Sequence, residues 1–392
     1  MNSSLVRLSF RCSKRSPRHA WLMPLRLLAL GLLVSCGGGG GTTTPAPQIA
    51  TRSFLMGFTP WPWDATQEAV DWTYQTIMSK GDIVSHHIEE GVPWPEALAG
   101  APFPASYANL LAERAARTPA GKKILLQINP LDIGRNALAP LRTDAALNAP
   151  LTAPWNTYSF NAPEVKTAFA NYALAMVDAL HPDYFQIGIE VNLLKRNNPA
   201  AWSQYVELQC HTYNAVKAAH PALPVSVSVF SVPFFPEWSA EDNLPDQLAA
   251  LGDVSACSDL IAFSVHPFVS GLLAETFPAD YFERLFAHAT KPVAITESSY
   301  PAQQWSLNGL TWNGTQAKQA DFLNKMLTAA QSRQLKFVIW YTVRDYDQLW
   351  SGTLGSDDLS LIWRDTGLYD ETGAAREAMT TWNSTLDKTY QP

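Results

Sequence analysis

Cysteine is scarce in this chain of 392 residues, which contains four, and none lies in a Cys-x-x-Cys or Cys/His spacing that would hold a metal. No Gly-rich turn follows the first apolar run, as a phosphate-binding domain would require. These absences argue against a cysteine-based metal centre and against a dinucleotide-binding sheet. Beyond the N-terminal region only Cys210 and Cys257 remain, and they could pair as a disulfide or stay as buried thiols.

The sequence also lacks an apolar run long enough to span a bilayer as a finished helix. The run LLALGLLVS follows six Lys and Arg residues, which is typical of a signal peptide. The run leads into Cys36, and the residues LVSC resemble the lipobox of bacterial lipoproteins. This resemblance implies that Cys36 is lipidated and that the protein is anchored to the outer membrane, periplasmic or surface-exposed. An ordinary secretory signal is the alternative, and translation could begin at Met1 or Met23.

Acidic residues outnumber basic ones once the signal segment 1–36 is set aside. That segment holds six of the 28 Lys and Arg residues and no Asp or Glu, so 22 basic residues face 35 acidic ones, a net charge of −13. Such a surface repels phosphate backbones, which argues against a nucleic-acid partner. Residues 37–50, rich in Gly, Thr and Pro, predict a flexible tether. We expect residues 51–392 to form a single catalytic domain, and we expect the protein to be a monomer.

Eight short apolar runs, mostly rich in β-branched or aromatic residues, alternate with amphipathic segments. The runs are 53–60, 81–87, 123–130, 183–192, 224–230, 259–267, 291–298 and 336–343. Four segments between them have apolar residues at helical spacing, namely 65–81, 165–182, 200–221 and 315–334. Strand–helix alternation implies parallel strands with right-handed crossovers, and eight such units close a barrel. We therefore predict an α/β fold, a (β/α)8 TIM barrel.

Function in such a barrel gathers at the carboxyl ends of the strands. Polar and aromatic residues at these ends are candidate substrate-binding residues: Trp61, Trp63, His86, His87, Asn129, Asn192, His266, Trp340, Arg344 and Asp345. Adjacent residues of a strand face opposite ways, so at most one of His86 and His87 is expected to face the site. His266 could instead be a structural histidine before Pro267, and Trp340 a core residue.

Two carboxylates stand at the ends of runs that otherwise look like buried strands, Glu190 after QIGI and Glu297 after PVAIT. A carboxylate is costly there unless it is hydrogen-bonded or used in chemistry. Hydrolysis of a glycosidic bond needs such a pair, one carboxyl to protonate the leaving oxygen and one to attack the anomeric carbon. Each Glu alone could be a strand-end carboxylate that accepts backbone N–H bonds.

The two segments resemble those of clan A glycoside hydrolases, whose two catalytic Glu residues end the fourth and seventh strands. FQIGIEVN and KPVAITESSYP are similar to segments of the endo-β-1,4-galactanases, and Trp340 and TGLYDETGAAREAMTTW extend the similarity to the end of the chain. The resemblance implies a retaining hydrolase of a β-linked polysaccharide or oligosaccharide that needs no cofactor and no metal. It implies Glu190 as acid/base, Glu297 as nucleophile, and Trp340 as the floor beneath the reacting sugar.

One position departs from the clan pattern. Most clan A families have Asn directly before the acid/base Glu, where it binds the sugar 2-hydroxyl, and here that position is Ile189. Strand alternation would turn Ile189 toward the helices and Asn192 inward, so Asn192 could supply the missing amide. Some β-mannanases of the clan also lack this Asn, so a β-mannanase-like activity is an alternative.

Two other functions fit the candidate residues. A metal-dependent barrel hydrolase could use a set of five ligands, namely His86, His87, Glu190, His266 and Asp345. A surface glycan-binding lipoprotein that has lost catalysis would keep the aromatic residues, although it would have no reason to keep both Glu190 and Glu297.

Overall fold

The computed structural model describes residues 50–239, 243–270 and 277–392. Cys36, with its lipobox-like segment, and the tether up to residue 49 lie outside the described residues. From Thr51 to Pro392 the chain forms one compact unit. Within the described ranges, we find no helix that is both long enough and apolar enough to cross a membrane.

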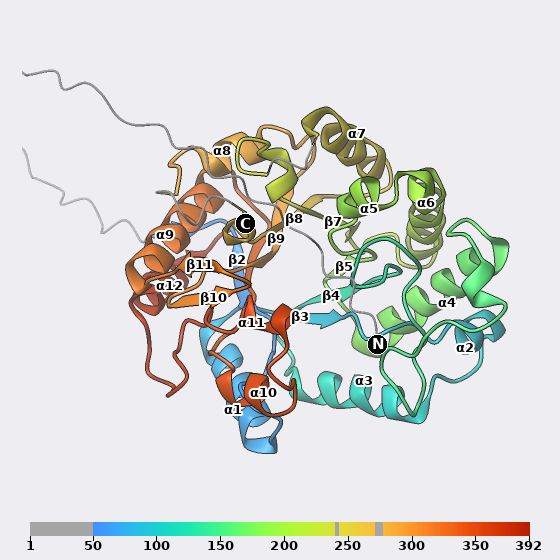
Figure 1. Ribbon diagram of the computed structural model, residues 1–392, viewed down its shortest axis with the longest axis horizontal. Coiled ribbons are helices and arrows are strands. Elements are labelled where there is room, and N and C mark those ends of the chain that lie inside the picture. The colour runs from blue at the N-terminus through green and yellow to red at the C-terminus, as the bar shows by residue number, and fades with distance from the viewer. Residues whose placement is uncertain (1–49, 240–242, 271–276) are drawn as a thin grey trace, which may run out of the picture. The chain divides into compact units, whose positions relative to one another are not determined.

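Eight parallel strands form the centre of this unit, and helices surround them (Figure 1). The strands are β2 (Leu55–Phe58), β3 (Ile83–Ile88), β4 (Lys123–Ile128), β5 (Tyr184–Gln186), β6 with β7 (Val225–Ser226 and Ser228–Phe230), β8 (Ile261–Val265), β9 (Val293–Ser298) and β12 (Phe337–Trp340). β6 and β7 are the two halves of the fifth strand, interrupted at Val227. β6 pairs with β5 and β7 pairs with β8, so the sheet closes on itself. This confirms the predicted (β/α)8 barrel.

The helices cover the outside of the barrel. They are α1 (Gln67–Lys80), α2 (Trp94–Ala99), α3 (Ala105–Arg117), α4 (Pro163–Leu180), α5 (Asn192–Asn197), α6 (Trp202–Ala219), α7 (Leu244–Ser255), α8 (Tyr281–Phe286), α9 (Gln316–Ser332), α10 (Asp347–Ser351), α11 (Asp358–Leu361) and α12 (Glu377–Leu386). Their starts follow from the sequence: the Thr66 and Thr315 side chains cap α1 and α9, and Pro163 opens α4. Short 3-10 turns lie at Trp155–Thr157, Pro199–Ala201, Val232–Phe234 and Pro267–Val269.

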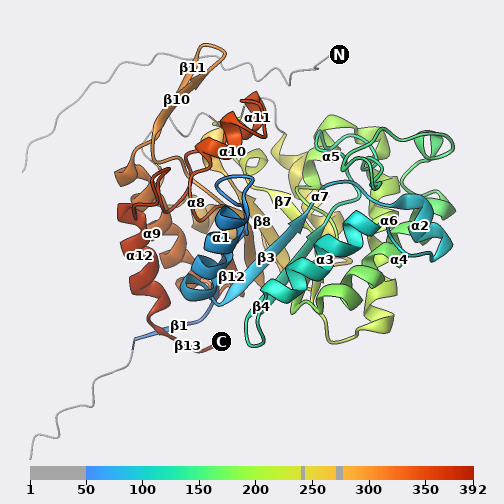
Figure 2. The same ribbon diagram turned by 90° about the horizontal axis from the view of Figure 1, so that it is seen from below.

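Two small ladders stand apart from the barrel sheet. β10 (Gln304–Leu307) and β11 (Leu310–Asn313) form an antiparallel hairpin in the loop after β9. β1 (Thr51–Arg52) pairs with β13 (Thr389–Tyr390). Figure 2 shows the hairpin at one end of the barrel, with α10 and α11, and the β1–β13 pair at the other. The hairpin end is therefore the end where the strands finish and where function is expected.

The inside of the barrel changes from apolar to polar along its axis. An apolar layer, which includes Leu55, Ile83, Leu125 and Phe337, fills the amino-terminal end. Above it lies a hydrogen-bonded chain of buried polar side chains that runs from strand to strand. It passes through Ser85, Gln127, Gln186, Ser228 and Ser264. Buried polar groups persist when they are paired, and this layer forms the base on which the candidate site is built.

The two cysteines form a disulfide. Cys210 in α6 bonds Cys257, which follows α7, with their Cα atoms 5.1 Å apart. The choice that the sequence left open is thereby decided, and the bond closes a loop of 47 residues on the outside of the barrel.

Candidate active site

Glu190 and Glu297 approach each other at the carboxyl ends of the strands. One carboxylate oxygen of each, and one ring nitrogen of His266, all lie within 4.8 Å of one another. The Glu190 side chain is 18% exposed and that of Glu297 is 7% exposed. Both carboxyls are therefore largely withdrawn from water. They are close enough to act on the same bond of a molecule held between them.

Glu190 stands on an unusual stretch of backbone. β5 ends at Gln186, and Glu190 has a φ of +53°, a left-handed conformation that costs a non-glycine residue about 1–3 kcal/mol. Two side chains hold it: Asn129 Oδ1 accepts from the Ile189 N–H at 3.2 Å, and Ser228 Oγ accepts from the Glu190 N–H at 3.0 Å. The neighbouring strands thus fix the direction of the Glu190 side chain.

Gly188 allows this stretch to lie close to α6. A Cβ atom at this position would lie 2.5 Å from the Tyr205 hydroxyl and 2.8 Å from a methyl group of Val191. Any larger residue would therefore force either this segment or the Tyr205 and Val191 side chains to shift.

A β-bulge turns Glu297 toward the axis of the barrel. Phe263 of β8 pairs with Ile295 of β9, but the next residue, Ser264, pairs with Glu297, so Thr296 is the extra residue. A bulge of this kind re-aims a side chain that regular alternation would place on the other face. Ser264 Oγ then donates to Glu297 Oε2 at 3.3 Å, which joins the carboxylate to the polar layer beneath.

His87 connects Glu297 with a second carboxylate, Glu89. Its Nδ1 lies 3.2 Å from Glu297 Oε1, and its Nε2 lies 3.2 Å from Glu89 Oε2. Burial alone would lower the pKa of His87, but the charges of Glu297 and Glu89 outweigh it and raise this pKa to about 10. His87 is therefore an imidazolium cation at neutral pH.

Arg135 completes the row of charges. Its guanidinium lies 2.5 Å from Glu89 Oε1 and 3.4 Å from Glu190 Oε2, and Asn129 Nδ2 also donates to Glu89, at 2.6 Å. Burial would raise the pKa of Glu89, but Arg135 and His87 lower it to about 2. Two cations and the anions Glu89 and Glu297 thus balance within the site.

The two catalytic candidates differ in protonation. Burial raises the pKa of Glu190 to about 7, against the pull of Arg135 and with the help of Glu297. Burial would raise the pKa of Glu297 too, but the charge and contact of His87 outweigh it and lower this pKa below its usual range. At mildly acidic pH one proton therefore resides on Glu190 and none on Glu297.

His266 is the third group beside the two carboxyls. Its Nδ1 lies 2.7 Å from Ser299 Oγ, and its ring packs against aromatic neighbours, among them Trp363 at 5.9 Å. Burial lowers the pKa of His266 to about 4, so the ring is neutral at neutral pH. A neutral imidazole here can donate or accept a hydrogen bond near Glu297.

Half-buried aromatic rings lie beside His266, the group next to the two carboxyls. Trp61 lies 6.1 Å from Tyr341 between ring centroids, and Tyr341 lies 6.4 Å from Trp363. Burial raises the pKa of the Tyr341 hydroxyl, and the negative charge of Glu297 raises it further. The substrate-binding residues predicted from the sequence include Trp61 but not Trp363, and Tyr341 was noted only as a residue at the end of its strand. Strand alternation next to a buried Trp340 could have identified Tyr341.

Trp340 is a correction to the sequence prediction. Its side chain is fully buried, its Nε1 donates to the Thr366 carbonyl, and its ring lies 6.0 Å from Phe322 of α9. It therefore packs between β12 and the helices, and Tyr341, the next residue, turns inward. Trp340 is a core residue and not the floor of a sugar site.

His86 and Asn192 are also turned away from the pair. His86 is buried on the outer side of β3, with Nε2 3.0 Å from Thr118 Oγ1. Asn192 bonds the backbone of Phe230 through both ends of its amide, and Gln247 as well. His86 thus lies on the wrong side of its strand to reach a sugar. The amide of Asn192 is already paired at both ends, so it does not supply the amide missing at Ile189.

Arg344 and Asp345 serve the loop after β12. Asp345 forms a buried ion pair with Arg376, with both side chains almost fully covered. Arg344 stacks on Trp63, its guanidinium carbon 4.2 Å from the ring centroid, and donates to the Glu371 carbonyl. Asp345 is thus unavailable to a substrate, whereas Trp63 and Arg344 are half-buried and form a stacked pair beside the mouth of the barrel.

The structure does not bring together the five metal ligands considered from the sequence. His86 and Asp345 have other partners. Among the described residues, Glu190, His266 and Glu297 form one group close enough to share an ion, and Asp345, Asp347 and Glu371 form a second, separate group. The carboxylates of the first group already face the cations Arg135 and His87. A further cation would have to compete with both of them.

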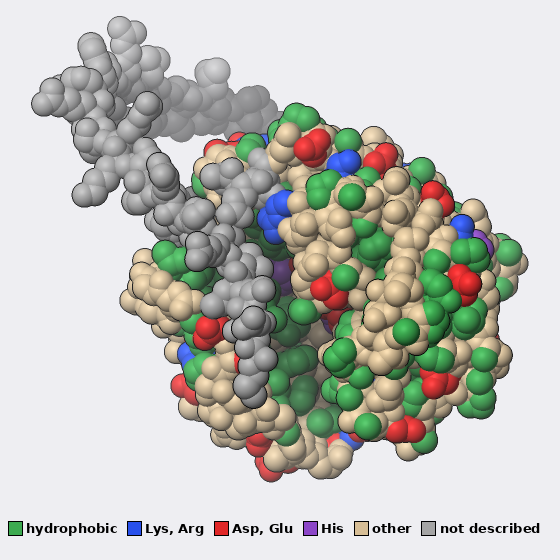
Figure 3. All heavy atoms as spheres, turned by 45° about the vertical axis from the view of Figure 1, so that its right-hand side comes forward, with side chains coloured by type: hydrophobic (Ala, Val, Ile, Leu, Met, Phe, Trp, Pro, Cys, Tyr) green, Lys and Arg blue, Asp and Glu red, His purple; other side chains and the backbone are tan. Residues whose placement is uncertain are grey.

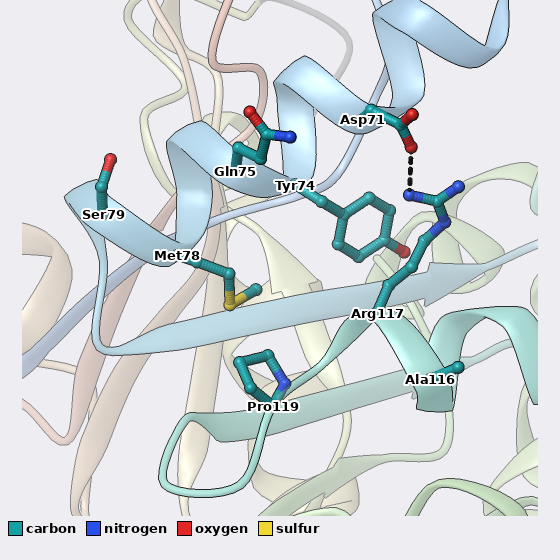
Figure 4. Close-up of a pocket in the computed structure, with 8 residues that line it drawn as sticks. All are labelled: Asp71, Tyr74, Gln75, Met78, Ser79, Ala116, Arg117 and Pro119. Atoms are coloured by element: carbon teal, nitrogen blue, oxygen red, sulfur yellow. Dashed lines mark hydrogen bonds and ion pairs between the residues drawn. The ribbon is translucent and has the colours of Figure 1, made fainter.

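Figure 3 shows a hollow in the face turned to the viewer, with hydrophobic side chains along its walls. A separate depression of about 580 Å³ lies between α1 and α3 on the outside of the barrel (Figure 4). Asp71 and Arg117 form an ion pair at its edge, 2.7 Å apart. None of the candidate site residues lines this outer depression, and we assign it no role.

The comparisons with known proteins concern the fold. No family model matches the sequence, and a search of the curated proteins finds no match. The likeness is to solved structures of glycoside hydrolase barrels, and it shows that this chain shares their fold. Similar solved structures include a GH5_18 protein from Bifidobacterium longum subsp. longum in complex with Manβ1-4GlcNAc (15% identity, TM-score 0.59, 86% of this chain and 80% of that chain).

Two further structures show the same likeness. One is the exo-β-1,4-mannosidase Op5Man5 from an Opitutaceae bacterium (13% identity, TM-score 0.58, 86% of this chain and 60% of that chain). The other is a fungal β-1,4-galactanase (14% identity, TM-score 0.51, 81% of this chain and 91% of that chain). At such identities the similarity establishes the barrel, and the activity has to be argued from the site.

Proposed function

We propose that the protein is a retaining glycoside hydrolase, with Glu190 as acid/base and Glu297 as nucleophile. The observation that carries this proposal is the approach of two carboxyl oxygens within 4.8 Å at the mouth of a barrel. Retaining enzymes hold their two carboxyl groups about 5–5.5 Å apart, whereas inverting enzymes leave about 6.5–9.5 Å for a water molecule. The short separation favours a covalent glycosyl-enzyme intermediate.

The opposite pKa shifts of Glu190 and Glu297 support these two roles. Glu297, ionised, attacks the anomeric carbon and forms an ester bond, while Glu190 gives its proton to the departing glycosidic oxygen. Glu190 is then a carboxylate and takes a proton from water, whose oxygen attacks the same carbon. The Glu297 ester bond breaks, and both groups return to their starting states.

The aromatic rings around the pair suit a sugar. The C–H faces of a pyranose pack on aromatic rings, and Trp61, Tyr341 and Trp363 are half-buried neighbours. Tyr341 and Trp363 also lie beside His266. Trp63, stacked with Arg344, could extend this surface to a further sugar unit. We infer that the substrate is an oligosaccharide or polysaccharide with a β-linkage.

Two sugars are candidates for the reacting position. The segments around Glu190 and Glu297 resemble those of β-1,4-galactanases. Because residue 189 is Ile, the side-chain amide that usually binds an equatorial 2-hydroxyl is missing, and the Ile189 N–H itself donates to Asn129. The missing amide favours a sugar with an axial 2-hydroxyl, as in mannose. Similar barrels from an exo-β-1,4-mannosidase and from a complex with Manβ1-4GlcNAc support the second choice.

The test is intact-mass spectrometry of residues 50–392 after incubation with 2-fluoro-galactosyl and 2-fluoro-mannosyl inactivators. We expect a single covalent adduct with one of them, located on Glu297 by peptide mapping and absent in Glu297→Gln. The Glu297→Gln change preserves the size of the side chain, so a folded variant without adduct tests the nucleophile. An adduct on another residue would refute the assignment.

Two controls separate the alternative functions. A metal-dependent hydrolase would lose turnover after prolonged chelation, whereas a retaining glycosidase of the proposed kind keeps it. A glycan-binding protein without catalysis would bind oligosaccharides in a calorimeter yet form no adduct with either inactivator. Loss of turnover on chelation, or binding without an adduct, would contradict the proposal.

We also propose that Cys36 carries a lipid and anchors the protein as a monomer at the bacterial outer membrane. The support is the LVSC segment followed by a run of Gly residues. Labelling with a fatty-acid analogue should modify the wild type and not Cys36→Ser, which should move to the soluble fraction. Equal membrane association of the two proteins would refute the anchor.

A further inference from the structure

Glu89 is a buried carboxylate that the proposed mechanism does not use. It lies at the end of β3, two residues after His87, and its side chain is 15% exposed. Three groups converge on it: Arg135, His87 and the amide of Asn129. A charge with this many partners inside a largely closed site is held in a defined place, and it requires an explanation beyond folding.

The contacts form a chain in which charges alternate in sign. Arg135 contacts Glu89 at 2.5 Å, Glu89 contacts His87 at 3.2 Å, and His87 contacts Glu297 at 3.2 Å. The other end of the Arg135 guanidinium reaches Glu190 at 3.4 Å. The two catalytic candidates are therefore the two ends of a single row of ionic contacts, and Glu89 is at its centre.

We propose, on the basis of the proposed function, that Glu89 is a positioning residue: it holds His87 as an imidazolium against Glu297, so that the proton shared by the two catalytic carboxyls resides on Glu190. Glu89 itself touches neither the sugar nor the reacting atoms in this assignment. It acts through His87, whose ring would otherwise have a single carboxylate partner.

Simple electrostatics gives the direction of the effect. A histidine between two carboxylates keeps its proton far above its ordinary pKa, and the cation in turn favours the ionised form of each carboxylate. If Glu89 loses its charge, His87 loses its proton at a lower pH, and Glu297 loses its counter-charge. Glu190 and Glu297 would then compete more equally for one proton, and the productive arrangement would be less populated.

Arg114 of α3 donates to the His87 carbonyl at 3.5 Å, and further charged or titratable groups face the His87 side chain. Besides Glu89 on its own strand, these are Glu297 of β9, His266 after β8, Tyr341 after β12, Arg135 after β4 and Glu190 after β5. His266 is neutral because of its burial, and burial likewise keeps Tyr341 protonated. The two carboxylates in contact with His87 therefore dominate its ionisation.

Glu90 provides a matched control. It is the next residue along the chain, and it faces Arg114 and Arg142 at 3.9 and 3.8 Å instead of the site. Glu90→Gln makes the same chemical change as Glu89→Gln one position away. Glu89→Asp shortens the side chain but keeps its charge, and it serves as the conservative variant.

The direct test is the titration of the His87 ring by ¹⁵N NMR in residues 50–392, with the signal identified by its loss in His87→Gln. We expect an imidazolium up to about pH 9 or above in the wild type and in Glu90→Gln. Glu89→Gln should lower the His87 midpoint by about one pH unit or more, and Glu89→Asp should restore most of it. A wild-type His87 that is neutral at pH 7, or a midpoint that Glu89→Gln leaves unchanged, would overturn the proposal.

The second readout is the pH dependence of labelling by the inactivator that the wild type accepts. Glu89→Gln should move the acid limb to higher pH, because Glu297 then protonates more readily, and should narrow the profile; Glu90→Gln should match the wild type. The two tests are separable. No labelling with any sugar would count against the glycosidase, whereas the NMR titration tests the role of Glu89 independently of activity.

Discussion

The backbone N–H of Ile189 donates to the side-chain oxygen of Asn129, 60 residues earlier in the chain, at 3.2 Å. The end of the third barrel strand thereby fixes the segment that carries Glu190, which has left the regular strand. The other end of the Asn129 amide holds Glu89. One side chain thus connects the backbone of the proposed acid/base with the charge row that leads to the proposed nucleophile.

Replacement of Asn129 with Ala should lower kcat strongly and change KM much less. The carboxyl group of Glu190 would remain, but its side chain would no longer be held in one orientation. A misplacement of about 1 Å can cost on the order of 100-fold in rate. Steady-state kinetics on the substrate identified by labelling would measure this. The half-buried Asn161, which contacts Glu207 on α6, provides a control as Asn161→Ala. An equal loss in both variants would contradict a special role for Asn129.

Arg135→Gln should shift the basic limb of the kcat/KM profile to higher pH. Arg135 stabilises the ionised form of Glu190, so its removal raises the pKa of Glu190 still further. The acid form would then persist to a higher pH, and we expect a shift of about one pH unit or more. A shift in the opposite direction would show that Arg135 does not act on Glu190 through its charge.

Trp340 and Tyr341 should respond to substitution in opposite ways. Trp340→Phe removes a fully buried indole and its bond to the Thr366 carbonyl, and should destabilise the protein by about 2–4 kcal/mol. Its kcat/KM should change little at a temperature where it is folded. Tyr341→Ala should reduce kcat/KM by about tenfold or more, ~1.4 kcal/mol, with a smaller effect on stability.

Urea unfolding monitored by circular dichroism, together with kinetics, would separate these two effects. A loss of kcat/KM in Trp340→Phe at full folding would return Trp340 to the sugar site. Unchanged kinetics in Tyr341→Ala would remove Tyr341 from it.

The double change Cys210→Ala and Cys257→Ala should lower the free energy of unfolding. The bond closes a loop of 47 residues, and in the chain-entropy model such a loop corresponds to roughly 4 kcal/mol. Urea unfolding of the wild type with a reductant should approach the curve of the double variant, whose own curve should not respond to the reductant. Identical curves for the oxidised wild type and the variant would contradict a stabilising role.

The sequence was sufficient to predict the barrel because a (β/α)8 fold repeats its pattern. Each predicted run overlaps one observed strand, including 224–230, which forms the two halves β6 and β7. The weakest prediction was the run 183–192, of which only Tyr184–Gln186 is regular strand. After Gln186, hydrogen bonds from Asn129 and Ser228 override the strand geometry, and neither can be read from the local sequence.

Alternation of side chains was the less reliable guide to the site. It correctly predicted that only one of His86 and His87 faces the site. It did not predict which one, because both faces of a parallel barrel strand are buried. It failed for Asn192, which lies beyond the irregular segment and begins α5. It would also have placed Glu297 on the wrong face, because the bulge at Thr296 depends on the register with β8.

Arg135 was missed altogether. It lies in the long loop after β4, in a left-handed conformation with a φ of +52°, and the only sequence signal nearby is the Asp132–Gly134 turn. Loops are positioned by contacts that are distant in sequence, here with Glu89 and Glu190. Pattern analysis therefore identified the two neighbouring carboxylates at the mouth of the barrel, but not the groups that set their charge.

The pairing of β1 with β13 brings the two ends of the barrel unit together. Thr51 pairs with Thr389 and Arg52 with Tyr390, so the two ends of the unit are neighbours. A short linker from Pro392 to Thr51 would therefore permit new ends elsewhere, for instance between the exposed residues Asn308 and Gly309 at the tip of the β10–β11 hairpin. Such a circular permutant would retain every strand neighbour, and it would move the chain termini from the base of the barrel to its mouth, where a fused sugar-binding module could reach the substrate.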